Sequence, residues 1–193
     1  MRKLSLVAGV AALAVTAGTA QAHGLDASGA GFAAGFAHPL SGLDHLLAMG
    51  AVGLWATQLG GRALWQVPLA FLTMMAVGSL AGFTGLPIPA VEVGIVSSLL
   101  VLGALVAMSA RLPVAIGAAL VGLFALFHGH AHGTEMPQAA SAALYGLGFV
   151  LATAFLHAAG LAFGTVGANG IGRWAVRLGG AGVTAAGLLL LVA

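Results

Sequence analysis

The sequence predicts an all-α membrane protein with six transmembrane helices that follow a cleavable signal peptide. Three observations lead to this prediction. Of the 193 residues, 61% are apolar and only 5% are charged, whereas about 25% of the residues of an ordinary soluble domain are charged. The chain begins with the anatomy of a secretory signal. Six apolar windows of spanning length then follow. This composition excludes both a lone soluble domain and a disordered chain.

Residues 1–22 are expected to form the signal peptide. Two basic residues precede an apolar stretch over residues 4–15, and residues 20–22 (Ala-Gln-Ala) match the A-x-A cleavage pattern. An uncleaved first transmembrane helix is the alternative, but the apolar stretch is short for the ~20 residues that a span needs. Cleavage would leave residues 23–193 as a single transmembrane domain that starts at His23, outside the membrane.

The six windows define the expected helices in order. Each reaches the ~20 residues that a tilted helix needs to cross the hydrocarbon. The expected spans are residues 29–58, 64–83, 90–109, 112–132, 138–163 and 171–192. The first three spans would run opposite to the last three, and both halves begin with a histidine-bearing helix. We therefore add the hypothesis that two three-helix halves form an inverted repeat.

The charges and tryptophans orient these spans. If the signal peptide is cleaved, every remaining basic residue falls at a cytoplasmic end, and the outer loops contain no Lys or Arg, as the positive-inside rule requires. The basic residues are Arg62, Arg111, Arg173 and Arg177. The tryptophans Trp55, Trp65 and Trp174 lie at the same ends, as expected for an interfacial belt. Both termini of the mature chain are therefore expected outside.

Glycine spacing predicts close helix packing, and charge and cysteine content exclude other classes. The spacings Gly31-x-x-x-Gly35, Gly78-x-x-x-Gly82 and Gly160-x-x-x-Gly164 suit helix contacts, although each is weak evidence in a chain with 31 glycines. Six basic against four acidic residues indicate no nucleic-acid partner. The absence of cysteine excludes disulfides, thiolate catalysis and thiolate metal ligands.

A first polar cluster lies in the first span. Charged groups at the bilayer centre cost roughly 2.5–3.5 kcal/mol, so residues of this kind are functional candidates. On a straight helix His38 and His45 share a face but lie ~10.5 Å apart along the axis. Pro39 and Gly42 can break the helix between them, which would bring the two rings together. Asp44 is expected to accept a ring N–H from a histidine of another helix, or to bind an ion itself.

The second cluster contains His128, His130, His132 and Glu135. The alternate spacing of the histidines favours an extended or frayed segment at a helix end. In an α-helix, His128 and His132 would instead share a face and His130 would point away. Three imidazoles and a carboxylate within eight residues indicate a site for borderline metals such as Ni, Co, Cu or Zn.

Two further histidines stand alone. The spacing around His157 leaves a packing role and a functional role equally open. His23 would become the N-terminal residue on cleavage, where its α-amine and imidazole could chelate a divalent ion together. For the first cluster the structural alternative is hydrogen bonding between helices, and for the second it is a fortuitous histidine-rich loop.

Depth orders the candidate ligands into a path. Counting ~1.5 Å per residue from the outer face, we place them in four successive levels. From outside to inside these are His130, His132 and Glu135; then His38 and His128; then Asp44 and His45; and finally His157. A purely structural site would need only one closed cluster.

At these residues the sequence closely resembles the HupE/UreJ family of nickel permeases. The matching segments are His23-Gly24, His38 to Gly42, Asp44-His45, Met49, Phe127 to Glu135, and Ala152 to His157. The resemblance implies a cytoplasmic-membrane protein that carries Ni(II), in some members Co(II), for nickel enzymes such as hydrogenase and urease. It also favours the functional role of His157. The pair Asp44-His45 is similar to the H-x4-D-H motif of the broader nickel–cobalt transporters, although His38 lies one residue further away.

We therefore expect a divalent-metal permease that prefers Ni(II), with the ion as substrate, no cofactor and no enzyme activity. No P-loop is present, which excludes ATP hydrolysis by this chain. An intramembrane zinc hydrolase is the alternative, and it predicts a closed three-ligand site with one open position. A metal sensor or metallochaperone subunit would bind metal without transmembrane flux. The sequence leaves the oligomeric state open.

Overall fold

The computed structural model describes residues 27–136 and 141–192, which form seven α-helices and no strand. Five of these helices are long and apolar enough to cross a membrane. They are α4 (Ala63–Phe83), α5 (Val91–Met108), α6 (Val114–Thr134), α7 (Ala142–Val166) and α8 (Ile171–Val192). They coincide with the last five predicted windows, so the all-α membrane class is confirmed. The predicted signal peptide, with His23, lies outside the described residues.

The first predicted window forms two helices, α2 (Ala27–Ser41) and α3 (Leu43–Leu59). Gly42 separates them with an extended backbone, φ −92° and ψ 118°. Pro39 lies in the last turn of α2, where its ring disfavours continuation of the helix. The Ser41 hydroxyl donates to the His38 carbonyl oxygen at 2.7 Å, which occupies a carbonyl at the break. The break places the two histidines of the first cluster on different helices.

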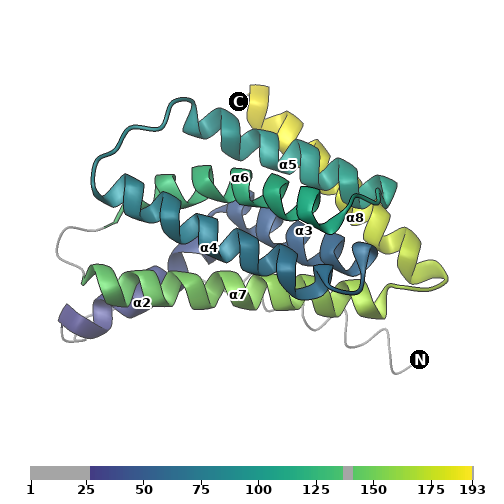
Figure 1. Ribbon diagram of the computed structural model, residues 1–193, viewed down its shortest axis with the longest axis horizontal. Helices are drawn as coiled ribbons and strands as arrows, with labels where there is room; N and C mark the ends of the chain where they lie inside the picture. Colours follow the sequence, from purple (N-terminus) through teal and green to yellow (C-terminus); the bar gives the residue numbers. More distant parts are fainter. Residues whose placement is uncertain (1–26, 137–140, 193) are drawn as a thin grey trace.

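The central element is α3, which contacts each of the six other described helices. The helices α2 and α7 lie along one side of the molecule, α5 and α8 lie along the opposite side, and α3, α4 and α6 lie between them (Figure 1). Fully buried side chains of α3, among them Met49, Val52 and Trp55, make up much of the core. The helices around α3 leave large apolar side chains exposed along their length, such as Leu80, Leu123, Leu151 and Leu189. Such a surface suits a hydrocarbon solvent.

Glycines allow the closest helix pairs to form. On α6, a Cβ atom at Gly129 or Gly133 would overlap the backbone of Met75 or Ser79 on α4. The three predicted glycine spacings also lie at contacts between helices. Gly31 and Gly35 face α7, Gly78 and Gly82 face α6, and Gly160 and Gly164 face α3. Small residues thus let the helix backbones approach one another, as predicted.

Two of the three tryptophans predicted for an interfacial belt are exposed, and the third is buried. Trp65 and Trp174 are 54% and 57% exposed, whereas Trp55 is fully buried. The Trp55 indole N–H donates to the Ala110 carbonyl oxygen at 2.9 Å. The prediction for Trp55 is wrong because α3 is surrounded by other helices, so a side chain at its end meets protein rather than lipid.

Candidate metal-binding site

The second histidine cluster is helical. The helix α6 continues to Thr134, so the expected extended or frayed segment is wrong. Gly129 and Gly133 pack against α4, and this tertiary contact supports a helix that glycine alone would weaken. His128 and His132 therefore lie one turn apart.

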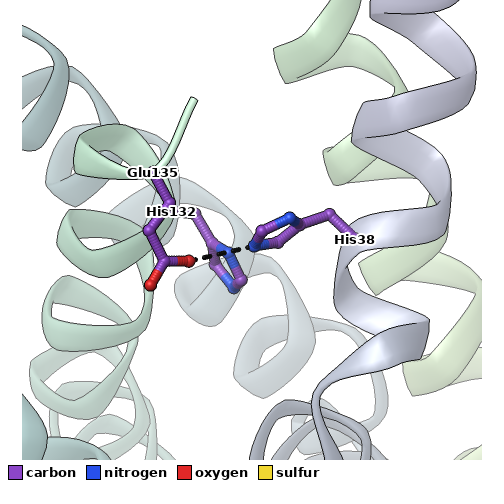
Figure 2. A group of neighbouring side chains, drawn as sticks. All are labelled: His38, His132 and Glu135. Carbon is purple, nitrogen blue, oxygen red and sulfur yellow. Dashed lines mark hydrogen bonds and ion pairs between the residues drawn. The ribbon is translucent and has the colours of Figure 1, made fainter. Parts of the chain in front are cut away.

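His38, His132 and Glu135 lie together, and we refer to them as the outer site after the side of the membrane on which the charge pattern predicts them. Each offers one ligand atom, and these atoms all lie within 4.8 Å of one another. The His38 Nε2 atom lies 3.1 Å from Glu135 Oε2, and the rings of His38 and His132 have centroids 4.6 Å apart. Figure 2 shows His38 reaching across from α2 to the two residues at the end of α6. Two imidazole nitrogens and a carboxylate oxygen suit a divalent borderline metal.

His45 and His128 form an inner pair next to the outer site. Their ring centroids lie 4.6 Å apart, and the centroid of His45 lies 4.1 Å from that of His132. His132 thus contacts a ring of the outer site on one side and a ring of the inner pair on the other. The break at Gly42 brings His38 and His45 to a common neighbour, rather than into contact with each other.

Hydrogen bonds assign the free nitrogen of each ring in the inner pair. Asp44 Oδ1 lies 2.9 Å from His45 Nδ1, and because a carboxylate only accepts, His45 Nδ1–H donates and leaves Nε2 with a lone pair. The Ser98 hydroxyl donates to the Ile95 carbonyl oxygen at 2.6 Å. The Ser98 oxygen also lies 2.8 Å from His128 Nε2, so His128 Nε2–H donates to this oxygen and leaves Nδ1 with a lone pair. Both free nitrogens are buried with no partner among the described residues. This arrangement orients metal ligands in proteins.

Asp44 differs from its prediction in one respect. Its partner is His45, the next residue of the same helix, and not a histidine of another helix. The N-terminal position of Asp44 in α3, directly after the break, lets its side chain fold back onto its neighbour.

His132 is 2% exposed, and neither of its ring nitrogens has a hydrogen-bond partner in the described part of the chain. The ring packs against Phe149, with centroids 4.1 Å apart. An unpaired buried polar group costs about 1–3 kcal/mol. A bound cation would compensate this cost at one nitrogen, which favours His132 as a ligand.

His157 lies beyond an aromatic ring. The Phe71 centroid lies 5.9 Å from that of His128 and 5.0 Å from that of His157. His157 is buried, and both its ring nitrogens lack partners among the residues that the structure describes. The structure thus brings five of the predicted residues together, with Asp44 behind them, and separates His157 from them by Phe71.

The structure does not bring His130 together with the other histidines. Its Nε2 atom lies 2.8 Å from the Leu86 carbonyl oxygen, so the ring donates to the turn between α4 and α5. The helical geometry of α6 directs His130 away from His128 and His132, as the sequence predicts for a helix. In this position the ring anchors a turn.

Replacing His130 by alanine is expected to leave the affinity of the protein for a divalent metal ion such as nickel unchanged. It should lower the free energy of unfolding by about 1 kcal/mol, the contribution of one hydrogen bond. Nickel titration calorimetry and thermal unfolding of the purified variant in detergent measure the two effects. A folded His130→Ala protein with a tenfold weaker nickel affinity would contradict this assignment.

Sequence reasoning missed Tyr145 and Ser98. Tyr145 is 4% exposed, and its hydroxyl has no partner among the described residues. It lines a cavity of about 190 Å³ between α4, α6 and α7, together with Ser79 and His132. Tyr145 is the only tyrosine of the chain, and Ser98 lies within a strongly apolar span. A polar side chain within an apolar span was, in each case, the signal that could have identified these residues from the sequence.

Known proteins resemble this chain over nearly its whole length. The family model described as "HupE / UreJ protein" matches residues 11–190. The curated "Protein HupE" of Rhizobium leguminosarum bv. viciae is 44% identical over 193 residues, which is 100% of each chain. No solved structure matches this chain. The family match includes every described helix that carries a candidate ligand, and the chain belongs to the HupE/UreJ family.

Proposed function

We propose that this chain transports divalent nickel, with cobalt as a second candidate substrate, inward across the cytoplasmic membrane. The observation that carries the proposal is the close succession of candidate ligands from the outer site through His132 to the inner pair. Imidazole and carboxylate groups suit nickel and cobalt, and the resemblance to nickel permeases implies the same substrates. The metal would serve nickel enzymes such as hydrogenase or urease.

Capture would begin at the outer site. The side chains of Glu135 and His38 are 58% and 29% exposed, so an ion can reach them while part of its water shell remains. His132 contacts both sets of ligands and would pass the ion to His45 and His128 by exchange of one ligand at a time. Each site must bind weakly enough to release the ion to the next.

Beyond the inner pair, the ion would pass Phe71 and reach His157. The Phe71 ring is fully buried between the rings of His128 and His157. Passage therefore needs a movement of this ring or of its helix, α4. We propose that Phe71 separates the outward-facing from the inward-facing part of the path.

The proposal includes the membrane arrangement. Together α2 and α3 would form the sixth span, broken at the ligand site as in other transporters, with both mature termini outside. Helix packing supports two inverted halves, in which α2/α3 corresponds to α6, α4 to α7, and α5 to α8. With this pairing, the contact between α2/α3 and α7 corresponds to the contact between α6 and α4. The contact between α5 and α8 joins two helices that correspond to each other, so the same exchange of halves leaves it unchanged.

Transport accounts for the ligands better than the alternatives. A zinc hydrolase needs one three-ligand site with an open position, and the outer site alone would supply it. It gives no role to the inner pair, which continues directly from His132. A metal sensor or metallochaperone would bind metal at the same residues without transmembrane flux.

Uptake of Ni, Co, Cu and Zn into proteoliposomes that enclose a metal-sensitive dye would test the proposal. We expect saturable nickel entry that depends on the protein, with competition by cobalt. Tight binding without entry would favour the sensor, and turnover of lipid or peptide by a zinc-loaded protein would favour the hydrolase.

Replacing Asp44 by asparagine is expected to weaken nickel affinity about 10- to 100-fold, the usual effect of losing a partner that orients a ligand. The amide oxygen can still accept from His45, but the charge that favours a bound cation is gone. Nickel titration of the purified variant measures the effect. Glu92→Gln, which removes an exposed carboxylate of α5, is the matched control. Equal affinities of Asp44→Asn and wild type would exclude this role of Asp44.

A further inference from the structure

A second polar cavity lies at the end of the bundle opposite the outer site. Its volume is about 250 Å³, and it lies where α3, α5 and α7 end and α8 begins. Gly164, which lines it, follows His157 by ~10.5 Å along the axis of α7. We refer to it as the inner cavity, because its arginines are those that the positive-inside rule assigns to the cytoplasmic side.

The inner cavity carries two positive charges that the described protein does not neutralise. Arg111 and Arg173 both line it and are exposed. No ion pair of either arginine occurs within the described residues. The described acids Asp44, Glu92 and Glu135 lie near the starts of α3 and α5 and at the end of α6, at the other end of the bundle.

The neighbouring Arg177, in contrast, has a side chain that is held by contacts within the protein. Its Nε donates to the Ala107 carbonyl oxygen at 2.7 Å, and its guanidinium lies 4.8 Å from the centre of the Trp174 ring. Arg111 and Arg173 have no such contacts among the described residues, so their donors remain available to a ligand.

The remaining polar groups indicate the kind of anion. The Gln58 amide nitrogen donates to the Val106 carbonyl at 3.0 Å, which leaves Gln58 Oε1 buried without a donor in the described part of the chain. Thr57 and Ser109 add hydroxyls to the lining. The start of α8 contributes the positive end of a helix dipole. A group that accepts from two guanidiniums and donates one hydroxyl to Gln58 fits this set.

We propose that the inner cavity binds a phosphate group between Arg111 and Arg173. Guanidinium groups bind phosphate in a bidentate manner. A hydrogen phosphate or a hydroxyl-bearing headgroup also carries a hydroxyl that can donate a hydrogen bond to Gln58 Oε1. The group comes either from free phosphate in the cytoplasm or from an anionic lipid of the inner leaflet. This inference does not depend on which cation the chain transports, or on whether it transports one.

A titration of metal-free, full-length protein in phosphatidylcholine nanodiscs tests whether the cavity binds free phosphate. Inorganic phosphate, titrated at constant ionic strength, is expected to raise the unfolding temperature of wild type saturably. The variant R111Q/R173Q should bind phosphate at least about tenfold more weakly, because two charge-assisted contacts are lost. R62Q removes an arginine that lies at the same end but outside this cavity, and it should behave like wild type.

Nanodiscs that contain phosphatidylglycerol test the lipid. If the lipid is the source, native mass spectrometry should show it retained by wild type and by R62Q and lost from R111Q/R173Q, and added phosphate should have no further effect. If the double variant does not fold, R111K/R173K, which keeps both charges without the planar fork, replaces it and should bind more weakly than wild type. Equal binding by wild type and the cavity variants, or no binding of either ligand by wild type, would overturn the proposal.

Discussion

Replacing His132 by alanine is expected to reduce nickel uptake about 100-fold or more, because losing a residue that only orients a metal ligand already costs about 10- to 100-fold. His132 belongs to the outer site, and its ring centroid also lies 4.1 Å from that of His45. Its removal leaves two incomplete pairs, Glu135 with His38 and His45 with His128, and no group that links them. Both binding and transfer should therefore fail.

The measurement is radioactive nickel entry into proteoliposomes, together with calorimetric nickel titration. The His130→Ala variant is the matched control, because it removes a histidine of the same helix that is 8% exposed and lies outside the ligand series. Uptake by a folded His132→Ala protein within twofold of wild type would refute the proposed path.

Replacing Gly129 by leucine is expected to destabilise the protein by about 3 kcal/mol or more, at or above the usual range for overpacking. A Cβ atom at this position would overlap the Met75 carbonyl oxygen of α4. The α6 backbone fixes the position of this Cβ atom, and the oxygen belongs to the α4 backbone, so neither can give way without separating α4 from α6. The same helix carries His128 and His132, so the ligand series should be lost with the fold.

Unfolding in mixed micelles, titrated with denaturing detergent, measures this loss. Gly179→Leu makes the same substitution in α8, where no atom of the other described helices lies within 4 Å of an added Cβ. This control should unfold at the wild-type midpoint or slightly above it, because leucine favours a helix more than glycine does. Equal midpoints for the two variants would show that the α4–α6 contact tolerates a side chain.

The sequence predicted the class of this protein and most of the candidate ligands. Low charge and apolar windows require a hydrocarbon solvent wherever the helices lie, so they indicated the last five helices without any knowledge of packing. Polar residues within such windows are costly, which identified His38, Asp44, His45 and His128 as candidates. Each of these predictions depends only on local composition and spacing.

Other features were decided by contacts between helices. Periodicity predicts which side chains share a face of one helix, but not which helix that face meets. The packing of α6 against α4 through glycine backbones makes the histidine cluster helical, directs His132 between His38 and His45, and leaves His130 to bind the Leu86 carbonyl.

The same physical reason explains the remaining differences. A window of 30 apolar residues is compatible with one kinked helix or with two helices. In the structure the chain breaks at Gly42, and the two helices on either side pack differently: α2 packs mainly on α7, whereas α3 contacts every other described helix. Trp55 is buried because α3 lies at the centre. The sequence by itself therefore determined the membrane class of the chain and the candidate metal-binding groups within its helices. Only the tertiary structure decided which of these groups meet, because close backbone packing between distant segments places them.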